Sequence, residues 1–583
     1  MCGIIGFKGR ENAGKAIFEG LKRLEYRGYD SWGIALNSGS LAIFRKPGKI
    51  DSLPAGFEGG SLGIGHTRWA THGAVTEKNA HPQVSNNRKI AVVHNGIIEN
   101  FLELKKFLSS HGFSFSSETD TEVIPNLIQF HLAKGLSFRE AVRKTLLQLD
   151  GYYAIVAVLE GSGTIIGARN GSPLAAGLGD KEFFIASDIP AFLPHTRKAV
   201  FLEDRELVEI NDSWKVFGID SGQEIRKKVQ RIHWGIEQVK KGNFEHFMLK
   251  EISEQPEAIE KAAMQDRARL KKIAGIIKKA DDVFFVGCGT SYHACISAEY
   301  AFSEIAGKRV KAVLASEFAR HTRFLSKKSV VVAVSQSGET IDLLETVRAA
   351  KEKKAKIISI VNVVGSSLPR MSNETIMMNS GPEICVLSTK SYTAQLAIIF
   401  LLAFSLSGRA SEGRCIIGKA AEQAAEAIRK SLPAAKKLAK KLSKKQDIFL
   451  IGRGNAFPSA LEGALKIKEV SYIHAEGFAG AELKHGTIAL IEKGVPVIVF
   501  MARESEKQTA SNAMEVKARG AFLIGVGEKK SEIFDEFFEM PECGEAEPIL
   551  RIIPVQLLAY YLALERSLDP DKPRNLAKSV TVK

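Results

Sequence analysis

The 583-residue chain has few cysteines and no long apolar run. Its six cysteines are too sparse for a disulfide framework, and none has the C-x-x-C or Cys/His spacing of a metal site. The most apolar stretch, 396–404, is too short to cross a bilayer, and the first residues lack the basic and apolar regions of a signal peptide. We therefore expect a cytoplasmic protein that binds no metal and no membrane.

The positive and negative charges of the chain are not balanced. It has 81 Lys and Arg residues and 66 Asp and Glu residues, which gives a net charge of +15. Such an excess suits nucleic acid or small anionic substrates. Part of it lies in 430–445, where lysines and leucines alternate at helical spacing and no aromatic side chains are present to stack on bases. We interpret this segment as a solvated helix face and expect no nucleic-acid partner.

A cysteine stands at position two. Removal of Met1 would make Cys2 the amino terminus, so that one residue would supply both a thiol nucleophile and an α-amino base, whose ordinary pKa is about 7.7–8.0. The alternative is a small buried residue that opens an edge strand, because free cysteine is among the most buried residue types. Motifs further along the chain favour the nucleophile.

Two predicted strands, 61–65 and 89–93, end in polar clusters. The side chain of Asn95 and the N–H of Gly96 can supply donors for an oxyanion at an attacked amide. Arg68 can hold a carboxylate and Asp120 can pair with an ammonium group, so the substrate would be an amino-acid amide. The alternatives are a hairpin turn at Asn95-Gly96 and a surface ion pair of Arg68 with Asp120.

Six N-terminal motifs together resemble the glutaminase domain of N-terminal-nucleophile amidotransferases: 2–6 (CGIIG), 25–31 (EYRGYDS), 66–73 (HTRWATHG), 79–82 (NAHP), 94–100 (HNGIIEN) and 117–122 (SETDTE). The resemblance implies a four-layer αββα sandwich in which Cys2 attacks the side-chain amide of glutamine, forms a thioester and releases ammonia. It also implies that Arg68 and Asp120 bind glutamine and that Asn95 and Gly96 form the oxyanion hole. Trp69 and Thr71 would lie near the ammonia exit, with His72 and His81 as supporting residues of the glutamine site.

The second half of the chain contains a tandem repeat. Residues 282–289, followed by a helix from about Ser291, resemble residues 447–454, followed by a helix from about Ser459. Val- and Ile-rich runs at 330–334 and 495–500 alternate with helices and predict parallel sheets that are covered on both faces. We therefore expect two doubly wound α/β domains.

The first copy has a serine-rich turn, 335–340, at the end of its Val-rich strand. Its hydroxyl groups and backbone N–H groups meet at the start of a helix and predict a phosphate cradle. Ser291 and Ser388 add further hydroxyls. The corresponding turn of the second copy, 501–505, lacks the hydroxyl pair, so we predict one phosphate site for the two copies. The alternative is a serine-rich helix cap, and the glycine spacing at 287–289 is too weak to indicate a dinucleotide.

The second copy carries Lys466 and Glu469, which share a helix face at i, i+3, and His485 follows downstream. Lys578 stands in the last ten residues. A carboxylate, an imidazole and lysines suit carbonyl chemistry such as imine formation and proton transfer between adjacent carbons. The alternative for Lys466 and Glu469 is an ordinary helix ion pair.

Eight motifs of the second half resemble the sugar-isomerase half of the glucosamine-6-phosphate synthase family: 288–291 (CGTS), 315–318 (ASEF), 335–340 (SQSGET), 362–367 (NVVGSS), 388–390 (STK), 460–466 (ALEGALK), 482–486 (ELKHG) and 573–582 (PRNLAKSVTV). This resemblance implies that the phosphate is bound by Ser335, Gln336, Ser337 and Thr340, and that the sugar is surrounded by Ser291, Val386 and Ser388.

The same resemblance assigns the chemistry of the sugar site. Lys578 would form a Schiff base with the ketone, Glu469 would move the proton between C1 and C2, and Lys466 would assist. His485 would open the sugar ring from the neighbouring subunit, which implies a homodimer. The sequence departs from the family pattern at Cys385 and Leu387, which replace smaller residues and put the geometry of the adjacent loop in doubt.

Together the two resemblances predict a multidomain α/β and α+β protein, an αββα glutaminase followed by two doubly wound sugar isomerase (SIS) domains. We assign 2–220 to the glutaminase, 221–245 to a linker, 246–420 and 430–572 to the first and second SIS domains, and 573–583 to an active-site tail. The expected reaction converts L-glutamine and fructose 6-phosphate into glutamate and glucosamine 6-phosphate, with internal transfer of ammonia and no cofactor. The alternatives are another keto-sugar phosphate as acceptor, a sugar-phosphate sensor without turnover, and amidophosphoribosyl transfer.

Overall fold

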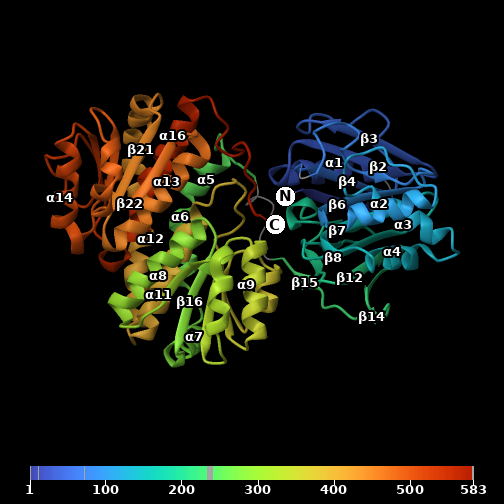
Figure 1. The fold of residues 1–583 in the computed structure, drawn as a ribbon, viewed down its shortest axis with the longest axis horizontal. Coiled ribbons are helices and arrows are strands. Elements are labelled where there is room, and N and C mark those ends of the chain that lie inside the picture. The colour runs from blue at the N-terminus through green and yellow to red at the C-terminus, as the bar shows by residue number, and fades with distance from the viewer. Residues whose placement is uncertain (1, 11, 71, 233–239, 581–583) are drawn as a thin grey trace. The chain divides into compact units, whose positions relative to one another are not determined.

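The computed structural model describes residues 2–10, 12–70, 72–232 and 240–580. The chain falls into two units, one formed by Met1–Lys240 with Ala577–Lys583 and the other by Lys241–Leu576 (Figure 1). Thr71, a predicted residue of the glutamine site, lies outside the described residues.

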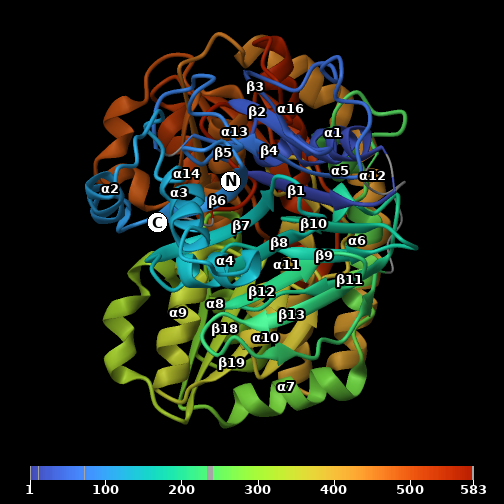
Figure 2. The same ribbon diagram turned by 90° about the vertical axis from the view of Figure 1, so that its right-hand side faces the viewer.

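The first unit is built on two antiparallel sheets. The eight-stranded sheet contains, in spatial order, β15 (Gln230–Arg231), β11 (Lys198–Phe201), β9 (Ala175–Leu178), β10 (Phe183–Ala186), β1 (Gly3–Lys8), β4 (Leu62–Arg68), β2 (Ser31–Asn37) and β3 (Leu41–Pro47). The seven-stranded sheet contains β14 (Glu224–Ile225), β13 (Trp214–Gly218), β12 (Glu206–Ile210), β8 (Ile165–Asn170), β7 (Gly151–Leu159), β6 (Ile90–Ile98) and β5 (Gln83–Val84). Figure 2 shows β1, β10, β9 and β11 in their order across the first sheet.

The two sheets pack face to face and helices cover their outer faces. Ile4, Ile64, Val93 and Val156 belong to the apolar layer between the sheets. Helix α1 (Ala13–Leu24) packs on the first sheet, since its buried residues recur at helical spacing. The second sheet is covered by α2 (Phe101–Ser110), α3 (Val123–Leu132) and α4 (Phe138–Leu146). The αββα sandwich predicted for this part of the chain is therefore confirmed.

The second unit contains two five-stranded parallel sheets of the same topology. The first has the order β17 (Lys311–Leu314), β16 (Asp282–Gly287), β18 (Ser329–Ser335), β19 (Lys356–Val361) and β20 (Glu374–Met377). The second has the order β22 (His474–Ala479), β21 (Asp447–Gly452), β23 (Pro496–Phe500), β24 (Phe522–Gly527) and β25 (Glu536–Glu539). Both follow the order 2-1-3-4-5, so the predicted tandem repeat of doubly wound domains is confirmed.

Helices surround these two sheets. The helices that belong to the first copy are, in chain order, α5 (Phe247–Ser253), α6 (Gln255–Ala263), α7 (Arg267–Lys279), α8 (Thr290–Ala306), η4 (Ala315–Phe324), α9 (Ile341–Glu352), α10 (Ser367–Met371) and α11 (Lys390–Leu406). The remaining helices are α12 (Ala410–Leu442), η5 (Gly454–Ala456), α13 (Phe457–Ser471), η6 (Glu482–His485), η7 (Thr487–Leu490), η8 (Arg503–Ser505), α14 (Glu506–Lys517), η9 (Gly544–Ala546), α15 (Glu547–Arg551) and α16 (Ile553–Glu565). One large apolar core contains residues of both copies.

Several predicted boundaries differ from the structure. The strands after 61 and 89 continue through His66–Arg68 and His94–Gly96. Strand β4 pairs with β1 up to Thr67 and with β2 up to Arg68, and β6 pairs with β7 along its full length. The gap that we assigned between the SIS domains, 421–429, lies inside the single helix α12. The stretch assigned to the linker contributes β14 and β15, one to each sheet of the first unit.

Among the described residues, one helical stretch, Gly544–Glu565, is long and apolar enough to span a membrane by length and composition alone, and 94% of its apolar 18-residue window is buried inside the protein. This stretch was not predicted from the sequence. A core helix of a water-soluble domain has the same composition when every face is covered by protein.

Candidate active sites

Cys2 precedes β1. It is hydrogen-bonded to the backbone of Trp69, which directly follows β4, and to the side chain of Asn95 on β6. Its Sγ accepts a hydrogen bond from the N–H of Trp69 at 3.1 Å, and its carbonyl oxygen accepts one from Asn95 Nδ2 at 2.8 Å. Burial raises the pKa of the Cys2 thiol. A buried thiol of this kind needs a base to become a nucleophile, which a free α-amino group on the same residue would supply.

Asn95 and Gly96 lie inside β6, opposite Ala154 and Tyr153 of β7. The hairpin-turn alternative is therefore wrong. Gly96 has a φ of 127°, and a Cβ at this position would lie 1.9 Å from the carbonyl oxygen of Tyr152. Only glycine fits this backbone.

Arg68 and Asp120 are both buried, with 3% and 4% of their surface exposed. The surface ion pair is therefore excluded as their explanation. The guanidinium of Arg68 donates to the carbonyl oxygens of His72, Gly73 (3.1 Å) and Ala74 (3.3 Å), while Asp120 Oδ2 accepts from the N–H of Ile98 at 2.8 Å. Arg68 thus orders the loop after β4, and Asp120 is fixed to the end of β6.

The aromatic residues of this loop pack edge to face against neighbouring rings. The ring of Trp69 lies 5.5 Å from that of Tyr29, and the ring of His72 lies 5.7 Å from that of Phe101. Trp69 also donates its backbone N–H to Cys2, so the loop is tied to the thiol. The structure thereby brings together all described residues of the predicted glutamine site.

The predicted phosphate turn lies at the carboxyl end of β18, where the strand order of the sheet reverses. Ser335 Oγ accepts from the N–H of Gly338 at 2.9 Å, and Ser337 Oγ accepts from the N–H of Glu339 at 3.2 Å. Thr340 is the N-cap residue of α9 and its side chain makes no capping bond. Gly338 has a φ of 68°. The turn, including the half-buried Gln336, therefore presents polar groups at a helix N-terminus and at the topological switch point.

Ser291 lies in the first turn of α8, after the neighbouring strand β16, and its hydroxyl accepts from Gln395 Nε2 at 3.0 Å. The loop with Val386 and Ser388 precedes α11, and the N–H of Val386 donates to the carbonyl oxygen of Asp571 at 3.3 Å. The carboxylate of Glu383 accepts from the N–H groups of Thr389 and Ser391, which fixes the end of this loop.

Cys385 and Leu387, where the sequence departs from the family pattern, do not expose their larger side chains to solvent. Both side chains are fully buried in the large core of the second unit. The N–H of Cys385 donates to Glu251, a buried carboxylate. The two larger residues therefore fill core space, and the loop backbone is held by hydrogen bonds from outside it.

Lys466 is fully buried in α13 and lies among groups of both copies. Its Nζ is 2.7 Å from Glu469 and 3.3 Å from Glu462, and it donates to Thr290 Oγ1 at 3.0 Å and to the carbonyl oxygen of Ser388 at 3.5 Å. Burial alone would lower the pKa of Lys466, but Glu462 and Glu469 outweigh it and raise the pKa. The i, i+3 pair does form, yet it belongs to a buried network that links α13 to the first turn of α8.

His485 lies in the same unit as this network, whereas Lys578 belongs to the first unit. His485 is exposed on η6, and none of the hydrogen bonds or ion pairs found among the described residues joins it to Lys466 or Glu469. The half-buried Lys578 belongs to the segment Ala577–Lys583, which groups with the first unit.

Comparison with known proteins links both units to one enzyme family. A family model for a glutamine amidotransferase domain matches residues 66–194, and a model for the SIS domain matches 276–405 and 441–566. Glutamine–fructose-6-phosphate aminotransferases (isomerizing) from Thermococcus kodakarensis and Pyrococcus horikoshii are each 45% identical to this chain over 100% of both chains. The chain belongs to this aminotransferase family. The resemblance drawn from its motifs is thereby confirmed.

A solved structure also resembles the second unit of this aminotransferase family member. It is the C-terminal domain of glucosamine-fructose-6-phosphate aminotransferase from Francisella tularensis, 32% identical, with a TM-score of 0.53, and the match covers 57% of this chain and 100% of that one.

Two polar residues of the second unit, Glu462 and His293, were not predicted from the sequence. Glu462 is fully buried and also accepts from Thr290 Oγ1 (3.0 Å) and His293 Nδ1 (2.8 Å). It stands four residues before Lys466, within the motif 460–466, so the i, i+4 spacing could have identified it. His293 had no comparable signal, because only the fold brings α8 to α13.

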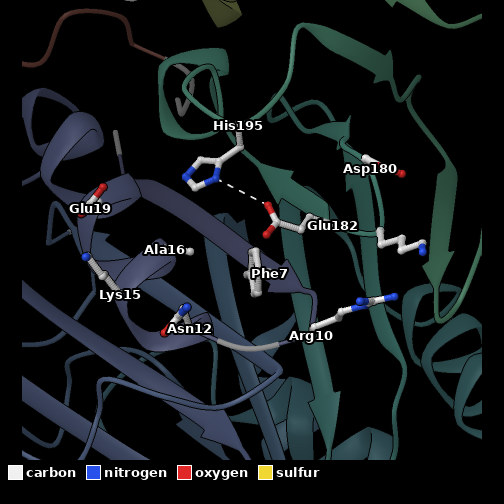
Figure 3. A pocket seen from close by; sticks show the side chains of 10 residues that line it. Phe7, Arg10, Asn12, Lys15, Ala16, Glu19, Asp180, Glu182 and His195 are labelled. Atoms are coloured by element: carbon white, nitrogen blue, oxygen red, sulfur yellow. Dashed lines mark ion pairs between the residues drawn. The ribbon is translucent and has the colours of Figure 1, made fainter.

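A cavity of about 640 Å³ lies in the first unit, lined by Phe7, Arg10, Asn12, Lys15, Ala16, Glu19, Asp180, Lys181, Glu182 and His195 (Figure 3). His195 Nδ1 lies 3.6 Å from Glu182 across it. The lining carries charges of both signs on mostly exposed side chains, and it includes none of the predicted site residues. We therefore assign it no part in the reaction.

Proposed function

We propose that this chain converts L-glutamine and D-fructose 6-phosphate into L-glutamate and D-glucosamine 6-phosphate, an amino-sugar precursor. The observation that carries the proposal is the presence of both half-sites in one chain: a half-buried Cys2 beside Asn95 and Arg68, and a hydroxyl-rich turn at the switch point of a SIS sheet. Full-length similarity to enzymes named for this reaction supports it.

In the glutaminase half, we propose that the Cys2 thiolate attacks the amide carbon of glutamine and that its α-amino group takes the thiol proton. Asn95 Nδ2 and the N–H of Gly96 stabilise the oxyanion. Collapse of this intermediate expels ammonia and leaves a glutamyl thioester, which water hydrolyses to glutamate. The glutamine carboxylate and ammonium are bound by Arg68 and Asp120, with Trp69, Thr71 and His72 around them.

In the sugar half, the phosphate is bound by Ser335, Gln336, Ser337 and Thr340, and the sugar is surrounded by Ser291, Val386 and Ser388. The polar groups at the start of α9 support this assignment, since a helix N-terminus favours an anion.

The chemistry of the sugar half is assigned to four side chains. Lys578 forms an imine at the C2 ketone with release of water, and ammonia then displaces the lysine amine from C2. Glu469 moves a proton from C1 to C2, which converts the C2 imine into the amine and the C1 alcohol into the aldehyde, and Lys466 stabilises the developing negative charge. The raised pKa of Lys466 supports a role as a cation and argues against a role as a base. His485 opens the ring and comes from the second subunit of a homodimer, which is consistent with its exposed position on η6.

The assignment of 2–220, 246–420 and 430–572 to the glutaminase and the two SIS domains, with a linker at 221–245 and a tail at 573–583, remains part of this proposal. So does a cytoplasmic location, which the six free cysteines support. No cofactor is required by the steps above.

Isotope transfer tests the proposal. The purified protein is incubated with amide-¹⁵N-glutamine and fructose 6-phosphate, and the amino sugar is analysed by mass spectrometry. Label in glucosamine 6-phosphate is expected from the wild type. Glutamate without labelled amino sugar would show that the acceptor is wrong, and binding without any turnover would favour the sugar-phosphate sensor. Lys578→Ala should stop amino-sugar formation, and Cys2→Ala should abolish glutamine use.

A further inference from the structure

Three buried histidines lie next to the proposed oxyanion site. His66 on β4, His81 and His94 on β6 are each at most 4% exposed. Burial lowers the pKa of all three, that of His66 to about 3, so these rings are neutral at physiological pH. His66 and His94 have no role in the reaction proposed above, and His81 has only the supporting role that the resemblance implies.

The hydrogen bonds of His66 fix its tautomer. His66 Nε2 lies 2.9 Å from the backbone carbonyl oxygen of His94 and 3.0 Å from Asn95 Oδ1. A carbonyl oxygen can only accept a hydrogen bond, so Nε2 must carry the ring proton. The atom of Asn95 that faces Nε2 must then be the acceptor Oδ1.

The orientation of the Asn95 amide follows from this tautomer. With Oδ1 turned toward His66, Nδ2 points the other way and donates to the carbonyl oxygen of Cys2 at 2.8 Å. An Asn95 side chain rotated by half a turn would place two N–H donors against each other at His66 and an acceptor where the oxyanion forms.

The ring of His66 is itself held in place. It stacks on the ring of His81 with 4.3 Å between ring centroids, and His81 Nε2 is hydrogen-bonded to Thr121 Oγ1 at 2.9 Å. Thr121 Oγ1 also lies 2.9 Å from His94 Nδ1. The rings and the hydroxyl therefore form one buried support behind Asn95.

We propose that His66 is a positioning residue for glutamine hydrolysis, whose Nε2–H holds Asn95 Oδ1 so that Asn95 Nδ2 faces the oxyanion. This inference rests on the proposed role of Asn95 in the oxyanion hole. His66 touches neither glutamine nor the reacting carbon and acts only through Asn95.

The test is a double-mutant cycle on the full-length protein, with glutamate release measured at saturating fructose 6-phosphate. His66→Phe keeps a ring to stack on His81 but removes the donor. Because loss of an oxyanion donor costs about 10²–10³ in kcat, a misoriented one should cost about 10–100-fold, with KM for glutamine changed less than about twofold. His66→Gln, which retains a side-chain N–H, should restore most of kcat.

The cycle is completed with Asn95→Ala and the double variant. If His66 acts through Asn95, His66→Phe should change kcat by less than about twofold once Asn95 is alanine. Alkylation of Cys2 by iodoacetamide, followed on its own peptide, forms no oxyanion and should proceed at the wild-type rate in His66→Phe. His131→Phe, which removes another buried histidine of the first unit, is the matched control and should leave kcat unchanged.

Different outcomes separate the two proposals. If Asn95→Ala keeps wild-type kcat, the oxyanion role of Asn95 fails and the inference on His66 fails with it. The inference on His66 alone fails if Asn95→Ala lowers kcat but His66→Phe does not. It also fails alone if the fold-losses in kcat of the two single variants multiply in the double variant. Slower alkylation of Cys2 would assign His66 a structural role and overturn the inference too. Should His66→Phe fold poorly, His66→Leu takes its place in the same cycle.

Discussion

Glu462 offers the sharpest test of the buried network in the sugar half. Glu462→Gln keeps the shape of the side chain and removes the negative charge that lies 3.3 Å from Lys466 Nζ. At an effective dielectric constant of about 20, such a pair is worth roughly 5 kcal/mol of attraction. Removal of one partner of a buried pair costs about 3–5 kcal/mol, and since Glu469 still faces Lys466 we expect the lower end, about 3 kcal/mol.

The two units can be monitored separately in this experiment. No tryptophan stands after residue 240 of the sequence, so tryptophan fluorescence does not report on the second unit, whereas far-UV circular dichroism also follows it. In a urea titration, Glu462→Gln should move the second-unit transition to lower denaturant concentration and leave the fluorescence transition in place. Amino-sugar synthesis should fall, because Lys466 loses a partner that keeps it charged.

A matched control uses the same chemical change on the surface of the same unit. Glu476 on β22 is exposed, so Glu476→Gln should change the free energy of unfolding by less than about 0.5 kcal/mol. If Glu462→Gln is as harmless as this control, the charge of Glu462 does not stabilise the buried lysine and our reasoning on the network is refuted.

Three further predictions concern the first unit and the phosphate turn. Gly96→Ala should abolish glutamine hydrolysis, because its Cβ would meet the carbonyl of Tyr152; glutamate release at the wild-type rate would contradict the geometry of β6. Gly338→Ala should raise KM for fructose 6-phosphate, since its Cβ would lie 2.3 Å from Ser366 Oγ, with glutaminase activity as the internal control. Below pH 6.5 the unfolded state binds a proton at His66 that the folded state does not, because the folded pKa is about 3. Through this residue, the free energy of unfolding of the first unit should therefore fall by about 1.4 kcal/mol between pH 7.5 and 5.5. In fluorescence-monitored urea titrations, the fall over the same pH range should be smaller by that amount in His66→Gln.

The fold could be predicted largely from the sequence. The Val-rich runs that become β18 and β23 identified two parallel sheets, since strands buried on both faces leave no alternation of polar residues. The boundary between the SIS domains could not be predicted, because the apolar spacing of α12 continues through it as one helix of 33 residues. The strands β14 and β15 were missed because two-residue edge strands leave no period to detect.

The candidate sites were predicted from motifs, but their internal geometry was not. We expected the polar residues around His66 and Asn95 to follow their strands, whereas they lie within β4 and β6. Polar residues can continue a buried strand when they hydrogen-bond to one another across the sheets, as His66 does with Asn95. A single sequence carries no record of such partners, and the same limit concealed the bond between Glu462 and His293.

In the function we propose, the two SIS copies contribute different residues to one sugar site. The first supplies the hydroxyl-rich turn after β18 and the start of α8, and the second supplies Lys466 on α13. Glu462 joins them, because its carboxylate accepts from Thr290 and His293 of the first copy while it pairs with Lys466 of its own. A fully buried carboxylate is tolerated only with all of these partners in place. Neither copy alone could therefore hold the lysine charged and directed at the loop of Ser388, which explains why the repeat lies within one continuous core.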